Sequence, residues 1–233
     1  MQTLIKLDNI SALYDGKAAL SNVSLQISDR DYLGVIGPNG GGKTTLMRII
    51  LGLMKPSAGK VTYFKDGQPT DNITIGYLPQ YNQIDKKFPI SVYDTVLSGL
   101  NSQKKPFRPF SKAQRQQAQD TITKMELGGL EDRAIGTLSG GQIQRTLLAR
   151  AIVSQPKALI LDEPNTYVDK RFQEQLYEML RIINQNCAVI IVSHDIASII
   201  QNAKHVACIN HTMHYHAGPN FEMETIERHF LKI

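Results

Sequence analysis

A glycine-rich run that ends in a lysine and two threonines is the part of this sequence most suited to chemistry. Glycines let successive backbone N–H groups turn toward one anion, and a lysine at this offset reaches the outer phosphates of a nucleotide. The hydroxyl that follows the lysine is a ligand for Mg²⁺. The run has the Walker A pattern and predicts a phosphate-binding loop that opens a helix. Its residues are Gly37, Pro38, Asn39, Gly40, Gly41, Gly42, Lys43, Thr44 and Thr45.

Two adjacent carboxylates follow a second apolar run, at residues 158–161. That run predicts a buried strand, and open α/β sheets bind ligands at the carboxyl ends of their strands. Asp162 is then expected to hold Mg²⁺, directly or through water, and Glu163 to accept the proton of an attacking water as general base. Acids that merely cap the next helix give the same pattern. The Walker A loop in the same chain favours the catalytic interpretation.

A second glycine turn, Leu138-Ser139-Gly140-Gly141-Gln142, lies far from the phosphate loop in the sequence. Ser139 is predicted to cap a helix, and the N–H groups of Gly140 and Gly141 are predicted to face an anion at its start. A turn that only begins a helix is the alternative. One phosphate loop is enough to hold one nucleotide, so the second glycine turn predicts a contact with a nucleotide bound by another chain. Two chains would then share two nucleotides, each held between a phosphate loop and the partner's glycine turn.

The segments around these motifs must form a sheet that presents the motifs at one edge. The apolar segment 33–36 predicts a buried strand before the phosphate loop. Residues 1–10 alternate as in an antiparallel strand, and strands and helices alternate again from residue 158 onward. Between residues 84 and 130, helical spacing replaces the β signal. A helix after the phosphate loop is predicted from apolar residues at helical spacing, which are Leu46, Ile49, Ile50 and Leu53.

With these motifs in this order, the chain resembles the ATP-binding subunits of ABC transporters along nearly all of its length. Segments 88–96 and 206–211 are similar to those of zinc and manganese importer ATPases. The resemblance implies an α/β P-loop NTPase fold. Its parallel-sheet core, residues 1–83 and 131–233, would carry an amino-terminal antiparallel β layer, and residues 84–130 would form a helical subdomain that leads into the second glycine turn.

Further family positions can be carried over to this sequence. Tyr14 matches the aromatic residue that stacks on adenine, and Gln80 matches the glutamine that contacts both the Mg²⁺ site and the membrane subunit. His194, after the apolar run 188–192, matches the histidine that contacts the γ-phosphate of ATP. Asp169 matches the aspartate of the D-loop, which runs along the seam between two subunits.

The resemblance implies ATP hydrolysis in a head-to-tail homodimer. The turn from Ser139 to Gln142 would cover the γ-phosphate of ATP held by the partner. Mg²⁺ would be the second cofactor, with Thr44, Asp162 and Gln80 as its ligands. Hydrolysis would power the transport of a divalent metal ion, such as zinc or manganese, through separate transmembrane permease subunits. An extracytoplasmic metal-binding protein would complete the system, with the ATPase at the cytoplasmic face of the membrane.

Three other functions stay open at this point. A soluble ABC ATPase that acts on nucleic acid or ribosomes would share the motifs, but such relatives usually hold two ATPase domains or a long coiled-coil insertion, and this chain has neither. An importer of another substrate, such as an iron chelate, is also compatible. An assembly module that binds ATP without needing hydrolysis is the third. Guanine specificity is not supported, because no Asn-Lys-x-Asp motif is present.

Three positions depart from the usual family pattern. Gly41 stands where many relatives carry serine or cysteine, which is expected to loosen the loop without removing a ligand. Asn165 and Tyr167 are less usual in the D-loop, so the details of signalling between subunits stay open. Glu163 is retained, which favours hydrolysis over nucleotide binding alone.

The composition narrows the choice of partners. With 26 basic and 21 acidic residues, the net charge of +5 suits a nucleotide and a membrane surface, but it is too small to indicate a nucleic-acid partner. The two cysteines, Cys187 and Cys208, are far apart in the sequence, which favours a reducing, cytoplasmic location. Residues 1–10 lack the pattern of a secretion signal, and no apolar run approaches the roughly 18 to 20 residues that span a bilayer.

Two clusters have a simple and a functional interpretation. Basic residues between 104 and 115 predict a solvated loop before a helix that starts near Ser111, or alternatively a surface for anionic lipid. His211, His214 and His216 predict an exposed edge strand, in which His214 and His216 share one face. A zinc site is the alternative, but no acidic or cysteine ligand lies nearby to complete a tetrahedral set.

Overall fold

The computed structural model of the 233-residue chain describes residues 2–14, 16–80, 88–165 and 170–218. Its strands are β1 (Thr3–Tyr14), β2 (Lys17–Ser28), β3 (Tyr32–Ile36), β4 (Ala58–Lys65), β5 (Gln68–Thr70), β6 (Ile75–Leu78), β7 (Ala158–Asp162), β8 (Ala188–Val192), β9 (His205–Asn210) and β10 (Thr212–Ala217). Its α-helices are α1 (Lys43–Ile50), α2 (Val92–Ser98), α3 (Lys112–Lys124), α4 (Gly140–Ile152), α5 (Lys170–Asn184) and α6 (Ile196–Asn202). Two 3₁₀ helices, η2 (Asn101–Gln103) and η3 (Ile135–Thr137), join them.

Six strands form the central sheet, in the order β10-β9-β3-β8-β7-β6. The pairs from β9 to β6 are parallel, and β10 pairs antiparallel with β9 at one edge. Every residue of β3, β7 and β8 is buried, as expected for parallel strands covered on both faces. The predicted parallel sheet is confirmed, and the carboxyl ends of its strands meet at one edge.

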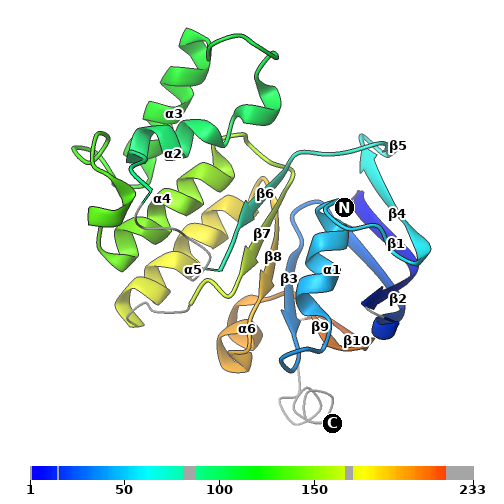
Figure 1. Cartoon of the computed structure of the whole chain (residues 1–233). Coiled ribbons are helices and arrows are strands. Elements are labelled where there is room, and N and C mark those ends of the chain that lie inside the picture. The colour runs from blue at the N-terminus through cyan, green and yellow to red at the C-terminus, as the bar shows by residue number, and fades with distance from the viewer. Residues whose placement is uncertain (1, 15, 81–87, 166–169, 219–233) are drawn as a thin grey trace.

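An antiparallel sheet in the order β2-β1-β4-β5 forms a second layer. Along β1, Ile5, Leu7 and Ile10 are buried while Lys6 is exposed, which is the alternation of a sheet with one face on the core. Helix α1 lies between this layer and the central sheet (Figure 1). The predicted amino-terminal β layer is therefore confirmed.

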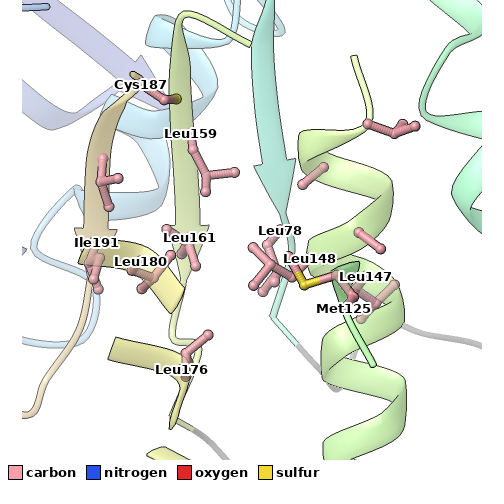
Figure 2. Close-up of a cluster of buried hydrophobic side chains, with 14 of the residues drawn as sticks. Leu78, Met125, Leu147, Leu148, Leu159, Leu161, Leu176, Leu180, Cys187 and Ile191 are labelled. Atoms are coloured by element: carbon pink, nitrogen blue, oxygen red, sulfur yellow. The ribbon is translucent and has the colours of Figure 1, made fainter. Parts of the chain in front are cut away.

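Alternation along the central strands divides the buried side chains between two cores. Leu159 and Leu161 of β7 face the core under helices α2 to α5. Ala158 and Ile160 face the core that β7 shares with α1 and the antiparallel layer. Figure 2 shows the first of these cores, where side chains from α4 and α5 meet those of the strands. The two cores cover both faces of the central sheet and so fix the positions of the strand ends at its carboxyl edge.

The chain between β6 and α4 is helical over much of the part that the structure describes. Ser111 begins α3 through a capping box with Gln114, so the helix predicted to start near Ser111 is confirmed. The Gln117 side chain donates to the carbonyl oxygen of Val153 at 2.6 Å, which joins α3 to the end of α4. Among the described helices, none is both long enough and apolar enough to cross a membrane.

Helix α1 is shorter than its apolar pattern predicts. It ends at Ile50, the backbone of Leu51 caps it, and Leu53 is 71% exposed. The prediction that Leu53 lies on the apolar helix face is therefore wrong. Gly52, with φ of 71°, turns the chain away from the helix before that residue is reached.

Candidate active site

The phosphate loop runs from the end of β3 into the first turn of α1. Gly42 precedes the helix in the left-handed conformation, with φ of 102°, and a Cβ there would lie 2.5 Å from the carbonyl oxygen of Ala19. The Lys43 ammonium turns back over the loop and donates to the carbonyl oxygens of Gly37 at 2.7 Å and Pro38 at 2.9 Å. The first N–H groups of a helix and its dipole attract anions, so this end of α1 suits phosphates.

A cavity of about 560 Å³ lies along this loop, a volume within the range of small-molecule sites. Its wall comes from the hairpin of β1 and β2, the start of α1, the ends of β6 and β7, and the turn after β9. The structure therefore gathers distant segments around one space. The predicted site residues in this wall are Tyr14, Asn39, Gly40, Gly42, Lys43, Thr44, Thr45, Gln80, Asp162 and Glu163. The other described lining residues are Lys17, Ala18, Ala19 and His211.

Glu163 follows β7 with its backbone in the left-handed region, at φ of 50°. Its N–H donates to the carbonyl oxygen of Val192, at the end of β8, at 2.9 Å. Its carboxylate lies 2.6 Å from Nδ1 of His194, and the side chain of Glu163 is 13% exposed against 68% for His194. Strained non-glycine residues of this kind collect at functional sites. The sheet edge thus holds a carboxylate and a histidine in direct contact.

Asp162 ends β7 in a buried, acidic environment. Burial raises the pKa of its carboxyl and the charge of Glu163 raises it further, whereas the Tyr77 hydroxyl, 3.5 Å from Oδ2, and Lys43 lower it. Burial, followed by the charge of Asp162, raises the pKa of Tyr77 to about 12. Burial lowers the pKa of Lys43, and the two carboxylates oppose that effect. Two acids therefore share a poorly hydrated space, in which a cation would relieve their repulsion.

The donors around this space fit a magnesium ion. Mg²⁺ prefers hard oxygen ligands. Thr44, Asp162 and Gln80, whose side chains contain oxygen, all line the same cavity. Burial, and then the adjacent Glu163, raise the pKa of the Asp162 carboxyl, and a cation bound there would favour its ionised form.

The second glycine turn forms the start of α4. Oγ of Ser139 accepts a hydrogen bond from the N–H of Gln142 at 3.3 Å, and Oε1 of Gln142 accepts one from the N–H of Ser139 at 3.0 Å. This capping box confirms the predicted role of Ser139 as the helix cap. Gly141 packs on the ring of Phe172, and a Cβ would lie 3.1 Å from Cδ2 of that ring. Among the described residues, Ser139, Gly140, Gly141 and Gln142 are not part of the cavity wall of their own chain.

The segment after the two carboxylates is anchored to α4 and α5. The Gln144 side chain of α4 donates to the carbonyl oxygen of Pro164. Nδ2 of Asn165 donates to the hydroxyl oxygen of Tyr177, on α5, at 2.9 Å. These contacts give the unusual Asn165 a structural role. Asp169, which was assigned to the D-loop, lies outside the described residues.

Tyr14 lies at the end of β1 and in the cavity wall, with 43% of its surface exposed. Its hydroxyl donates to Sδ of Met54 at 3.3 Å and accepts from Arg48 at 3.4 Å. These contacts hold the ring at its polar end, while much of the ring stays accessible. The arrangement is compatible with stacking on a base.

Gly41 has a packing role that the sequence did not indicate. A Cβ at this position would lie 2.9 Å from the carbonyl oxygen of Ile209 and 3.1 Å from that of Pro38. The carbonyl oxygen of Gly41 accepts a hydrogen bond from the N–H of His211 at 2.8 Å. The turn between β9 and β10 therefore rests directly on the phosphate loop.

Of the three carboxyl-terminal histidines, His214 and His216 lie on β10, whereas His211 precedes that strand. Strand β10 is an edge strand, on which His214 is exposed and His216 is half-buried, as the edge-strand interpretation predicts. Burial, and then the neighbouring His214, lower the pKa of His216. Within the part of the chain that the structure describes, no group of three or more His, Cys, Asp or Glu residues could hold a metal ion. His211 lies instead in the wall of the cavity.

Tyr77 and His211 are candidates that the sequence analysis did not place in this site. Tyr77 lies near the end of β6 and reaches Asp162 on the neighbouring strand. His211 directly follows β9. A signal existed for both, because each lies at the carboxyl end of an apolar strand, the edge where parallel sheets bind ligands. What the sequence lacked was evidence that these two strands belong to the same sheet.

Comparison with known proteins agrees with this geometry. The family model described as "ABC transporter" matches residues 20–166. The zinc import ATP-binding protein ZnuC of Pasteurella multocida is 37% identical over 211 residues, which cover 89% of this chain and 73% of that protein. The zinc uptake system ATP-binding protein ZurA of Listeria monocytogenes is 35% identical over 215 residues, which cover 90% of this chain and 84% of that protein.

Solved structures share the fold. One is described as an inward-facing conformation of a metal-chelate type ABC transporter; its TM-score is 0.87 at 27% identity, and the match covers 99% of this chain and 89% of that chain. A dimeric ATP-binding cassette with ADP and phosphate, MJ0796, has a TM-score of 0.78 at 24% identity over 94% of this chain and 100% of that chain. The predicted fold class is confirmed. The chain belongs to the ABC transporter family and is one of its ATP-hydrolysing subunits.

Proposed function

We propose that this chain is the ATPase subunit of a divalent-metal importer, and that two copies hydrolyse ATP at sites they share. The observation that carries the proposal is the 2.6 Å contact between Glu163 and His194 beside the cavity of the phosphate loop. In this pair Glu163 would act as the general base and His194 would contact the terminal phosphate, and their contact beside the cavity supports both roles. The named relatives supply the metal class.

ATP would lie along the cavity with its phosphates at the start of α1. The loop N–H groups and Lys43 would hold the β- and γ-phosphates, and Tyr14 would stack on the base. When bound, Mg²⁺ would be held by Thr44 and Asp162, with Gln80 nearby, and would neutralise charge on the phosphate oxygens. The three oxygen donors share one cavity wall, which supports this assignment.

Hydrolysis follows from the groups around the terminal phosphate. Glu163 accepts a proton from the attacking water, because its carboxylate is little exposed and lies at the end of β7. His194, in contact with Glu163, would bond the γ-phosphate and keep the carboxylate oriented. Lys43 and the amino terminus of α1 would stabilise the charge that develops on the phosphate.

A second copy would complete each site. The turn at Ser139 begins a helix and suits an anion, yet it stands apart from the cavity of its own chain. In a head-to-tail dimer with two-fold symmetry, the turn of one copy would cover the terminal phosphate bound by the other, and each copy would do so for its partner. Ser139 and Gly141 would make those contacts, and Asp169 would lie along the seam.

A permease would dock in a second cavity, of about 590 Å³, between the helical segment and the β layer. Its lining includes Gly52 after α1 and residues 71–77, together with Gln103 of η2 and Arg150 of α4. The lining residues come both from the sheets and from the helices that follow β6. If closure of the dimer around ATP moves these helices relative to the sheets, the shape of the cavity would change. Gln80, which lines the nucleotide cavity, would couple closure of the dimer to the change at the permease surface.

The transported substrate would be a divalent metal ion. Two relatives are named for zinc import or uptake, so zinc is the first candidate. Manganese is the second, from the similarity of segments 88–96 and 206–211 to zinc and manganese importer ATPases. The fold neighbour described as metal-chelate type supports a metal chelate as the alternative, of which an iron chelate is one. The ATPase would lie at the cytoplasmic face of the membrane through its permease, and an extracytoplasmic metal-binding protein would deliver the ion.

Reconstitution tests this proposal. The chain would be purified from membranes with its bound permease, placed in proteoliposomes, and supplied with ATP and either Zn²⁺, Mn²⁺ or a ferric chelate. We expect ATP-dependent uptake of a divalent ion and no uptake with Glu163→Gln. Uptake of the ferric chelate alone would contradict the divalent-metal assignment, and uptake that persists in Glu163→Gln would contradict the catalytic one.

A further inference from the structure

The turn between β9 and β10 is fastened to the phosphate loop through its backbone. His211 is the single residue between the two strands, and its N–H donates to the carbonyl oxygen of Gly41 at 2.8 Å. Its own carbonyl oxygen accepts from the N–H of Ser21, on β2, at 2.6 Å. The carbonyl group of Ile209 packs against Gly41. These contacts fix the position of His211 relative to the loop that would hold the phosphates.

The side chain of His211 is exposed and forms part of the cavity wall. Its backbone has φ of 58°, which glycine adopts without steric cost and other residues adopt rarely. Glycine would therefore serve best if the turn only joined two strands. A non-glycine residue with a strained backbone beside a ligand cavity points to a role for its side chain.

The order of strands places His211 at one end of the expected nucleotide. In the central sheet, β9 lies on one side of β3, whereas β8, β7 and β6 lie on the other. Asp162, Glu163 and Gln80 come from the β7 and β6 side, where the terminal phosphate and Mg²⁺ would lie. His211 comes from the β9 side. A nucleotide whose terminal phosphate meets the carboxylates would therefore extend its inner part toward His211.

We propose that His211 is a nucleotide-binding residue, whose imidazole donates a hydrogen bond to the ribose or α-phosphate of ATP. The proposal rests on the nucleotide site assigned above and adds a ligand-binding residue to it. Imidazole keeps an N–H donor in both of its protonation states. Lys17 and Lys43 are the other basic residues described in the wall, so His211 extends a set of donors along the length of a polyphosphate.

The test compares nucleotide affinity among variants of this turn. His211→Gly removes the imidazole and suits the left-handed backbone, so the turn keeps its contacts with Gly41 and Ser21. His211→Asn also tolerates this backbone and retains an N–H donor. His214→Ala, on the exposed part of β10, is the matched control. Dissociation constants for ATP and for ADP would be measured by titration calorimetry, and the melting temperature of each variant would be measured without nucleotide.

We expect His211→Gly to weaken ATP and ADP about tenfold each, which is near the upper end for the loss of a hydrogen bond to a neutral group and near the lower end for one to a charged group. Its melting temperature without nucleotide should not fall. His211→Asn should recover part of the affinity, and His214→Ala should match the wild type. Equal loss for the two nucleotides is required, because the ribose and α-phosphate are common to both.

Three results would overturn the inference. Unchanged affinities in His211→Gly, with binding abolished by Lys43→Ala, would remove His211 from the site and leave the proposed function intact. A loss confined to ATP would place the contact at the γ-phosphate instead. Unchanged binding in Lys43→Ala would show that the cavity is not the nucleotide site, and the proposed function would fail together with the inference.

Discussion

Replacing Glu163 by glutamine removes the proposed base with little change in shape. The carboxylate lies 2.6 Å from Nδ1 of His194 and its side chain is 13% exposed, so the amide would occupy the same enclosed place and could still accept a hydrogen bond from the histidine. The amide cannot accept the proton of water. The cavity wall that would bind the nucleotide is otherwise the same, so ATP affinity should be preserved.

The expected loss lies in the chemical step. A positioned general base contributes about 10²- to 10⁴-fold, so kcat should fall by that factor, which corresponds to about 2.7 to 5.4 kcal/mol of activation free energy. Phosphate release would be measured at saturating ATP and Mg²⁺, and ATP affinity would be measured separately by calorimetry. Wild-type kcat in this variant, or a loss seen only as a higher KM, would refute the assignment of the base.

A double variant sharpens the same test. Because Glu163 and His194 are in direct contact, their effects should not add. Glu163→Gln combined with His194→Ala should therefore lose less activity than the product of the two single losses, because only the contact of His194 with the phosphate remains to be removed. If the two losses multiplied, the residues would act independently, and the contact between them would have no catalytic meaning.

Asp162→Asn should raise the melting temperature of the nucleotide-free protein at neutral pH, because the raised pKa of Asp162 means that folding disfavours its ionised form. This gain over the wild type should disappear below about pH 3.9, where the carboxyl is protonated in the unfolded chain as well. Cys187 and Cys208 should resist iodoacetamide at pH 8 until urea unfolds the chain, because burial raises their pKa values to about 12 and 11; rapid labelling of the folded protein would contradict this. Gly59→Ala should cost about 1 to 3 kcal/mol in urea unfolding, since its Cβ would lie 2.4 Å from the carbonyl oxygens of Asn9 and Asp8, whereas Gly128→Ala, with no heavy atom within 4 Å of its Cβ, should not destabilise the chain.

Local patterns were sufficient for the parts of the site that single segments determine. The phosphate loop, the strand before Asp162 and the cap at Ser139 each depend on residues within about one turn or one strand. The wrong prediction for Leu53 has the same cause. The helical spacing of apolar residues continues to Leu53, although the helix ends at Ile50 and the chain turns at Gly52.

Contacts between distant segments were out of reach of those patterns. Tyr77 meets Asp162 only because β6 pairs with β7, and His211 meets the phosphate loop only because β9 pairs with β3. The packing of Gly41 against Ile209 has the same origin. A single sequence contains the strands but not their order, so these partners became visible only in the assembled sheet.

The central claim is that the turn at Ser139 completes the site of a second copy. The direct test is the particle mass of Glu163→Gln with ATP and Mg²⁺, measured by light scattering and compared with that of Glu163→Gln combined with Ser139→Arg. We expect particles of two chains for the first protein, and single chains that still bind ATP for the second. Single chains for both proteins, together with full hydrolysis by a monomeric wild type, would contradict it.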